Sequence, residues 1–125
     1  MKVEVVNLAE KFSRFSEYYS PKVAGELNDN HVKLVKLQGD FIWHHHDHED
    51  ELFLVVKGEL RMGIRDAAGE REFTIKPGEF IIIPHGVEHK PSAEDETHIV
   101  LLEPKTTLNT GNVTNERTVA RPERI

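Results

Sequence analysis

The feature that most constrains the fold is a series of short apolar segments between residues 22 and 103, separated by clusters of glycine, proline, asparagine and aspartate. Apolar and polar side chains alternate along several of these segments, which is the period of a strand with one buried and one exposed face. The residues between the segments can supply the positive or fixed φ angles that tight turns require. The pattern predicts an all-β sandwich or barrel.

Alternation also predicts which side chains face inward. The strands are expected at 22–27, 31–37, 41–46, 51–56, 60–65, 72–75, 80–83, 87–91 and 97–103. Met62 lies on the opposite side of its strand from Arg61, and His89 shares the apolar side of its strand with Val87, so Met62 and His89 are expected inside. Strand 51–56 is apolar on both faces, so we expect cover on both sides, within the fold, under the helix or under a second subunit.

The two ends of the chain differ from this pattern. Apolar residues recur at helical spacing behind Asn7, a residue that can cap a first turn: Leu8, Phe12, Phe15 and Tyr19. They predict one N-terminal helix that ends before Pro21. The last residues are rich in threonine, asparagine, glutamate and arginine, which is typical of an arm or tail that pairs with a sheet edge or a second subunit. We therefore expect a helical segment 1–20, a barrel 21–104 and an arm 105–125.

Composition excludes several classes of protein. A chain of 125 residues is expected to form one compact core. Its net charge of −6 disfavours binding to nucleic acid or to an anionic membrane surface. With no cysteine, it has neither thiolate metal ligands nor a thiol nucleophile. The longest apolar run, 52–56, is too short to span a membrane, and we expect a cytoplasmic protein.

Histidine is the residue type that points to chemistry. The chain has eight histidines, and four of them are His44, His45, His46 and His48. If this segment is extended, His44 and His46 lie on one face with Cα atoms about 7 Å apart, close enough for both imidazoles to bind one ion. Taken alone, such a run could equally be a solvated loop that binds metal without physiological meaning.

Two residues from other strands complete the candidate site. Glu51 begins the strand that is apolar on both faces, and a buried carboxylate is costly unless it is paired, protonated or bound to a cation. His89 faces inward, and inward positions far apart in sequence converge in a closed barrel. Three imidazoles and one carboxylate suit a divalent transition metal such as iron, manganese, nickel, copper or zinc.

The segment 39–58 resembles the first motif of the cupin family. It has two histidines one residue apart, His44 and His46, a glutamate after a short gap, Glu51, and a glycine seven residues later, Gly58. Four residues separate Gly39 from His44, where the family usually has five. An alternative register with His46 and His48 leaves only two residues before Glu51, fewer than the family pattern allows.

The segment 78–89 resembles the second cupin motif, with Gly78, Pro84, Gly86 and His89 at the family spacing. The asparagine often found four residues after that histidine is Ala93 here. The resemblance covers about residues 22–103. It implies a double-stranded β-helix, or jelly-roll barrel, that holds a metal through the residues corresponding to His44, His46, Glu51 and His89.

These observations favour a small metal-dependent enzyme that acts on a polar organic molecule such as a sugar derivative or an organic acid, as an isomerase or a dioxygenase. Glu51 is the candidate catalytic residue, because a carboxylate can leave the metal and act as a base. Inward alternation suggests Phe53, Met62 and His98 as pocket residues, although a packed core histidine is the commoner outcome for His98. The alternative is a non-catalytic module that binds a small ligand, with a structural or ligand-orienting metal.

A homodimer is expected in either case. The strand 51–56 needs cover on both faces. The chain also resembles the cupin family, whose small barrels pair sheet to sheet.

Overall fold

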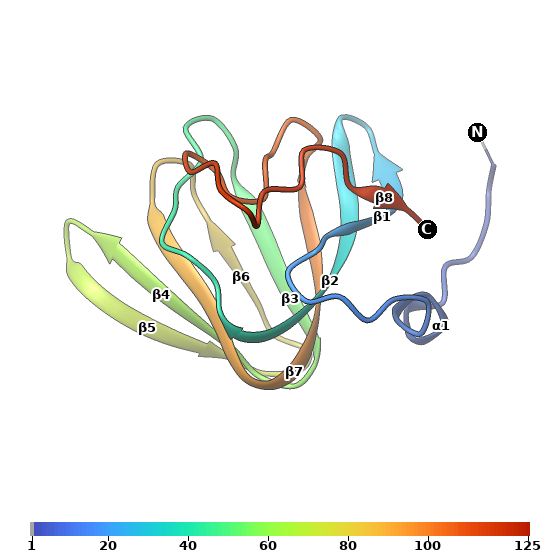
Figure 1. The fold of residues 1–125 in the computed structure, drawn as a ribbon, viewed down its shortest axis with the longest axis horizontal. Coiled ribbons are helices and arrows are strands. Elements are labelled where there is room, and N and C mark those ends of the chain that lie inside the picture. The colour runs from blue at the N-terminus through green and yellow to red at the C-terminus, as the bar shows by residue number, and fades with distance from the viewer. Residues whose placement is uncertain (1) are drawn as a thin grey trace.

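The computed structural model describes residues 2–125 and is built mostly of strands. Its elements are α1 (Leu8–Phe12), β1 (Lys22–Leu27), β2 (Asn30–Asp40), β3 (Glu51–Lys57), β4 (Leu60–Asp66), β5 (Gly69–Ile75), β6 (Phe80–Ile83), β7 (Glu88–Pro104) and β8 (Glu123–Arg124). The sheet order is β5-β4-β7-β2-β1-β8, and β3 pairs with both β6 and β7. The strands curl around a common interior (Figure 1). The prediction of an all-β jelly-roll barrel with one short N-terminal helix is confirmed.

Strand β7 holds the barrel together because it pairs with three other strands, β2, β3 and β4. The sequence predicts two strands here, 87–91 and 97–103, separated by a charged stretch. That division is wrong, since Ser92 and Ala93 stay paired with β2, and Ser92 also pairs with β4. The charged side chains between the predicted strands lie on the surface of one long, bent strand.

The helix is shorter than predicted. Asn7 caps it as expected, its side-chain oxygen accepting a hydrogen bond of 3.0 Å from the Glu10 amide. It ends at Phe12, however, because Ser13 closes the last turn with its amide and its hydroxyl group. Tyr19 has a φ of 55°, in the left-handed region, so no right-handed helix can continue through it. Phe15 and Tyr19 are buried all the same, as residues of an irregular segment.

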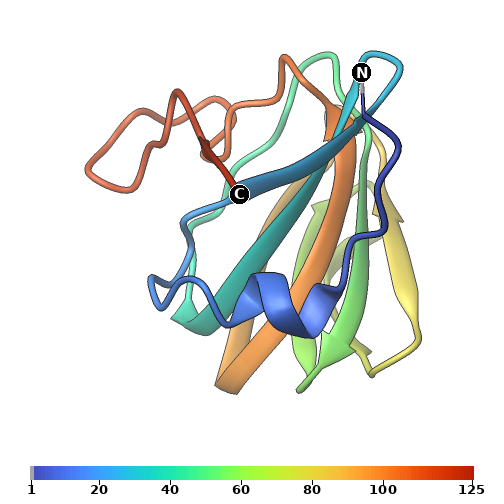
Figure 2. The same ribbon diagram turned by 90° about the vertical axis from the view of Figure 1, so that its right-hand side faces the viewer.

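Two apolar clusters lie on opposite faces of the sheet. The larger fills the barrel interior and includes Phe53 and Met62. The smaller lies outside, where Phe12 and Phe15 pack on Leu34 of β2. Figure 2 shows α1 lying across this outer face. The helix therefore covers part of the sheet and leaves the interior to the candidate site.

Two segments without regular strands frame one end of the barrel. Residues 41–50, where the sequence predicts a strand at 41–46, form no ladder and make only an isolated bridge between His44 and His89. Residues 105–122 run back over the barrel to β8, which pairs in parallel with the edge strand β1 (Figures 1 and 2). Within residues 2–125, no helix is long and apolar enough to cross a membrane.

Candidate metal centre

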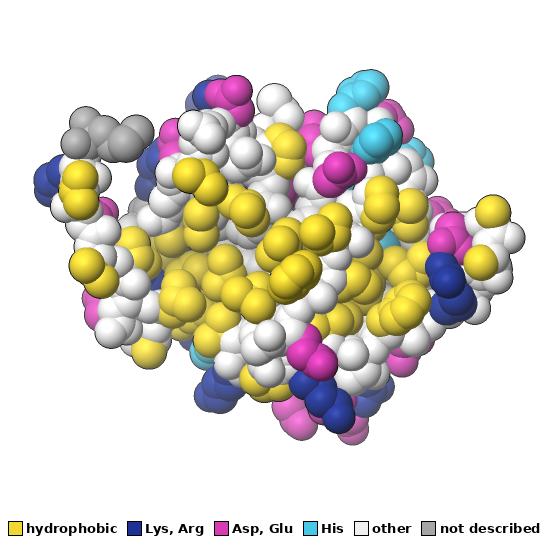
Figure 3. All heavy atoms as spheres, turned by 180° about the vertical axis from the view of Figure 1, so that it is seen from behind, with side chains coloured by type: hydrophobic (Ala, Val, Ile, Leu, Met, Phe, Trp, Pro, Cys, Tyr) yellow, Lys and Arg dark blue, Asp and Glu magenta, His cyan; other side chains and the backbone are white. Residues whose placement is uncertain are grey.

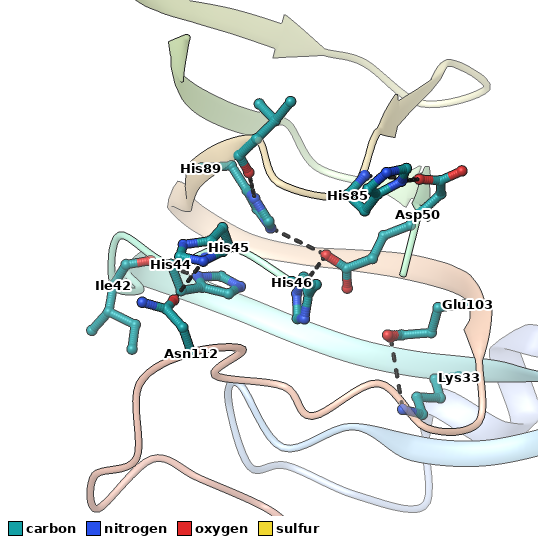
Figure 4. Close-up of polar contacts among 12 residues, drawn as sticks. Lys33, Ile42, His44, His45, His46, Asp50, His85, His89, Glu103 and Asn112 are labelled. Atoms are coloured by element: carbon teal, nitrogen blue, oxygen red, sulfur yellow. Dashed lines mark hydrogen bonds and ion pairs between the residues drawn. The ribbon is translucent and has the colours of Figure 1, made fainter. Parts of the chain in front are cut away.

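Four side chains from three parts of the fold meet inside the barrel. His44 and His46 come from the irregular segment after β2, Glu51 begins β3, and His89 lies near the start of β7. All four are buried, and one possible ligand atom from each lies within 4.8 Å of all the others. The structure thus brings together the four residues predicted as metal ligands (Figure 4).

The Glu51 carboxylate lies at the centre of this group. Its Oε1 atom is 3.1 Å from Nε2 of His89 and 2.9 Å from Nε2 of His46. The contact with His46 is close enough for an ion pair but is not aligned as a hydrogen bond, so among residues 2–125 Nε2 of His46 has no hydrogen-bond partner. The short contact between this buried imidazole nitrogen and the carboxylate oxygen is compatible with a cation bound by both groups.

Backbone carbonyl groups fix the orientation of two imidazoles. Nδ1 of His44 donates to the Ile42 carbonyl group at 2.9 Å, and Nδ1 of His89 donates to the Val87 carbonyl group at 2.9 Å. Each bond places the proton on Nδ1 and leaves the lone pair on Nε2 for a metal. The two backbones are also joined by hydrogen bonds of 3.0 and 2.8 Å between His44 and His89.

Burial and proximity hold the donors in metal-binding proton forms. Burial lowers the pKa of His44 to about 4, and the nearby His89 adds to this effect. Burial alone would raise the pKa of Glu51, but the neighbouring His46 and His89 imidazoles outweigh it and hold that pKa below its usual range. Near neutral pH the site thus contains a neutral His44 and an ionised Glu51.

The donor spacing fits a transition metal ion. Metal bonds of about 2.0–2.2 Å at right angles separate neighbouring donors by about 3.0 Å, whereas tetrahedral angles separate them by about 3.4 Å. The separations of 2.9 and 3.1 Å around Glu51 are close to both values and are also ordinary distances for an ion pair and a hydrogen bond, so they admit a shared ion without defining its coordination geometry. Four protein ligands leave room for further, non-protein ligands on an ion that accepts five or six.

A small cavity of about 40 Å³ adjoins two of the four side chains. His44 and Glu51 line one part of it, and most of the remaining wall is apolar. The other lining residues are Tyr19, Pro21, Val35, Leu37, Phe41, Phe53, Pro91, Ile99, Leu101, Glu103 and Asn109.

The three predicted pocket residues differ in their positions. Phe53 lines the cavity. Met62 is fully buried in the interior cluster but does not line it. His98 is a correction: it shares a face with Val100 as predicted, but that face is the outer one. Its ring stacks on Phe12 of α1 at 4.5 Å, and its Nε2 bonds to Glu96 at 2.8 Å.

Residues after β7 press against the segment that carries His44 and His46. Asn112 makes two hydrogen bonds with the backbone of His45, of 2.9 Å to its amide and 3.0 Å to its carbonyl group. Gly111 has a φ of 56°, and a Cβ atom there would lie 2.2 Å from the His45 carbonyl oxygen and 3.0 Å from the His44 ring. Only glycine permits this approach. We refer to residues 105–122 as the C-terminal strap.

The other histidines lie outside the group. His48 is exposed, and His45 pairs with Asp47 at 3.0 Å. Asp50 accepts hydrogen bonds from the backbone amide and the ring of His85, of 2.7 and 2.9 Å, and contacts none of the four donors in this way.

Sequence reasoning missed two buried charged residues, Glu103 and Lys33, whose charged atoms lie 3.7 Å apart beside the site (Figure 4). Alternation could have found both. Glu103 follows the inward residues Ile99 and Leu101 at intervals of two, and Lys33 precedes Val35 in the same way.

Comparison with known proteins agrees with this architecture. The sequence model of a protein family, the cupin domain, matches residues 31–104. Among solved structures, a cupin-2 domain protein from Shewanella frigidimarina NCIMB 400 is 44% identical, with a TM-score of 0.76 over 81% of this chain and 95% of that chain.

Two curated relatives match this chain over only part of their own length. The uncharacterized protein YdbB of Bacillus subtilis is 35% identical over 81 residues, which is 65% of this chain and 63% of YdbB. The 3-hydroxyanthranilate 3,4-dioxygenase of Xenopus tropicalis is 28% identical over 98 residues, which is 74% of this chain but 34% of the enzyme. The chain thus spans less than two thirds of either relative.

Proposed function

The chain belongs to the cupin family, and we propose that it is a small metalloenzyme that binds one divalent transition metal ion through His44, His46, Glu51 and His89 and acts on a small polar organic molecule. The observation that carries this proposal is the convergence of four buried donors within 4.8 Å of one another. The reaction classes we favour are isomerisation and dioxygenation.

The protein's own residues would divide the work as follows. The three imidazoles hold the ion, and the carbonyl groups of Ile42 and Val87 keep two of them aimed at it. A bound ion supplies Lewis-acid polarisation of a substrate oxygen or, if it is iron, oxygen-dependent chemistry. Glu51 faces the cavity and can accept a substrate proton when its carboxylate loosens from the ion.

The donor set limits the identity of the metal. All four donors are nitrogen or oxygen, which suits iron, manganese, nickel, copper or zinc. An ion that accepts five or six ligands would keep one or two positions open for a substrate beside the four protein donors. Similarity to a dioxygenase of Xenopus tropicalis supports dioxygenation, and iron is the first ion to test for that reaction class.

The second candidate function is a non-catalytic module that binds a small ligand beside a structural or orienting metal. The mostly apolar wall of the cavity favours it, because side chains such as Leu37, Phe53 and Leu101 can bind a ligand but cannot transfer a proton. A binding site can remain apolar, whereas an enzyme places a titratable group near the open face of the metal.

Turnover decides between the two functions. Protein loaded with Fe²⁺ or Mn²⁺ is incubated in air with small sugars, keto acids and hydroxylated aromatic acids, and products are followed by NMR. The enzyme hypothesis predicts conversion of at least one compound by wild-type protein and by His48→Ala, an exposed control, and none by His89→Ala. Ligand binding without conversion by the loaded wild-type protein would favour the binding module.

We also propose that the protein forms a homodimer through the face that carries β5 and β6. Phe80 and Ile82 of β6 are 59% and 52% exposed, and Phe73 of β5 is 42% exposed. Hydrophobic side chains cover much of the back of the molecule (Figure 3). The groove here also contains Asp66 and Arg71, which pair with each other, so these two residues add no net charge that would repel a two-fold related copy of the same surface.

Light scattering tests the dimer. Wild-type protein should have twice the chain mass of 14.3 kDa at micromolar concentration. Ile82→Asp should yield monomers, whereas Leu27→Asp, on the exposed end of β1, should remain dimeric. A monomeric wild-type protein would contradict this assembly.

A further inference from the structure

Glu103 is a buried acidic residue that the metal site does not use. It lies near the end of β7, is 2% exposed, and lines the same cavity as His44 and Glu51. It does not belong to the group whose ligand atoms lie within 4.8 Å of one another. Figure 4 shows its carboxylate beside that group, on the side of Lys33. Its place in the cavity therefore needs another explanation than metal ligation.

The two oxygens of Glu103 have different surroundings. Oε1 is 3.7 Å from Nζ of Lys33, a side chain that is also 2% exposed, and this is an ion pair rather than a hydrogen bond. Oε2 has no aligned hydrogen-bond partner among residues 2–125, and neither has the buried hydroxyl group of Thr107, which lies beside this carboxylate together with Glu51. An unpaired buried carboxylate oxygen is unfavourable, because it loses its hydration without a replacement. A group that enters the cavity could supply the missing hydrogen bond.

The remaining lining residues indicate the size and polarity of the ligand that would carry this hydrogen-bonding group. Most of the wall is apolar side chains such as Leu37, Phe53 and Leu101. A ligand in this space meets polar partners at only a few points, chiefly the metal site and Glu103. The volume of about 40 Å³ corresponds to roughly three water-sized groups at about 10–15 Å³ each, so the ligand is small.

We propose that Glu103 is a ligand-contacting residue that hydrogen-bonds the hydroxyl group of a small organic molecule, while another oxygen of that molecule binds the metal. A hydroxyl group satisfies Oε2 in either proton form of Glu103, since it can both donate and accept. The substrate class is thus a small molecule with a hydroxyl group next to a metal-binding oxygen. This inference rests on the proposed metal site and extends it.

Hydroxyacetone and acetone are suitable probes because they differ by one hydroxyl group and share a carbonyl oxygen. Binding is measured on Mn²⁺-loaded protein from the paramagnetic relaxation of the ligand protons. Wild-type protein should bind hydroxyacetone at least about tenfold more tightly than acetone, as expected for one well-placed hydrogen bond. Glu103→Gln, which keeps a hydrogen-bonding group, should retain the preference.

Two variants should lose the preference for hydroxyacetone over acetone. Glu103→Asp keeps the charge beside Lys33 but withdraws the carboxylate by one methylene group. The double variant Lys33→Met with Glu103→Met replaces the buried pair by apolar side chains of similar size, which avoids leaving one charge unpaired. In both, the affinity ratio should fall to about one with Mn²⁺ content unchanged.

Three results would overturn the inference and leave the proposed metal site standing. The first is equal binding of hydroxyacetone and acetone by the wild-type protein. The second is retention of the wild-type affinity ratio by both variants, which would assign the preference to chelation by the metal alone. Loss of Mn²⁺ from Glu103→Asp would instead make Glu103 a support of the metal site. Failure of wild-type protein to bind Mn²⁺ contradicts the proposed metal site itself, and this inference with it.

Discussion

The four donors reach the metal centre by two different routes. Glu51 and His89 lie on β3 and β7, where backbone ladders set their positions. His44 and His46 lie on a segment that forms no ladder and is held by a bridge to His89 on one side and by the C-terminal strap on the other. We call the first pair the strand-borne donors and the second pair the segment-borne donors.

The metal site therefore depends on residues outside the barrel strands. The strand-borne donors would keep their positions in any barrel of this register. The segment-borne donors depend on Gly111 and Asn112, which approach the backbone between His44 and His46. The strap is thus a structural part of the metal centre.

The largest effect should come from removing a strand-borne donor. His89→Ala removes one of the four donors, the imidazole whose Nε2 lies 3.1 Å from Glu51 Oε1. We expect the affinity for the metal to fall by more than about 100-fold, beyond the range seen when only a supporting residue is changed. Elemental analysis after dialysis measures this loss. His48→Ala should retain the metal, and retention by His89→Ala would contradict the four-donor site.

The next effect concerns a segment-borne donor and pH. His44 has a pKa of about 4 in the folded protein, whereas an unfolded histidine titrates near 6.5. Between these values the unfolded chain binds the additional proton, so the free energy of unfolding falls as pH is lowered. The difference corresponds to about 3 kcal/mol in metal-free protein.

Urea denaturation of metal-free wild-type protein and His44→Asn at pH 7 and pH 4.5 measures this contribution. The wild-type protein should lose more stability on acidification than the variant, by up to about 3 kcal/mol. An equal loss in both proteins would show that His44 is not held as a neutral imidazole by burial.

A smaller effect should follow from pushing the strap away from the segment-borne donors. Gly111→Ala introduces a Cβ 3.0 Å from the His44 ring, so we expect the affinity for the metal to fall about 10–100-fold, as for other supporting contacts. Gly78→Ala is the matched control: its φ of 85° is also positive, but its Cβ would have no neighbour within 4 Å. Isothermal titration should show weaker metal binding by Gly111→Ala than by Gly78→Ala. Equal affinities would show that the strap does not support the metal site.

The smallest effect should come from Asn112→Ala. The side chain accepts one hydrogen bond of 2.9 Å from the His45 amide, and its loss should cost about 1 kcal/mol of stability. The affinity for the metal should fall by less than about tenfold, because the amide of residue 112 still bonds to the His45 carbonyl group. Thermal unfolding with and without metal checks both expectations.

The sequence predicted the strand-borne donors for a sound physical reason. For His89 the reason is alternation along its strand, which the structure keeps, and for Glu51 it is the cost of burying a carboxylate at the start of a strand that is apolar on both faces. Alternation also indicated His44 and His46, although their segment is not a strand, because both side chains still point inward there. The same rule placed His98 with Val100 but could not tell the inner face from the outer one, which α1 covers.

Interactions between distant parts of the chain were the least predictable. Gly111 lies far from His45 in sequence, and nothing local marks it as a contact of the metal centre. The helix was overestimated because Phe15 and Tyr19 are buried at helical spacing by the sheet beneath them rather than by a helix. Glu103 and Lys33 carried the inward signal but were overlooked because charged residues usually lie outside.

The central claim is that four buried donors hold one metal ion, and metal analysis of the untagged protein purified without added metal tests it most directly. The account predicts close to one divalent transition metal ion per chain, retained through dialysis at pH 7.5 and released by a chelator. Protein that carries no metal and does not take up iron, manganese, nickel, copper or zinc when each is supplied would contradict the account.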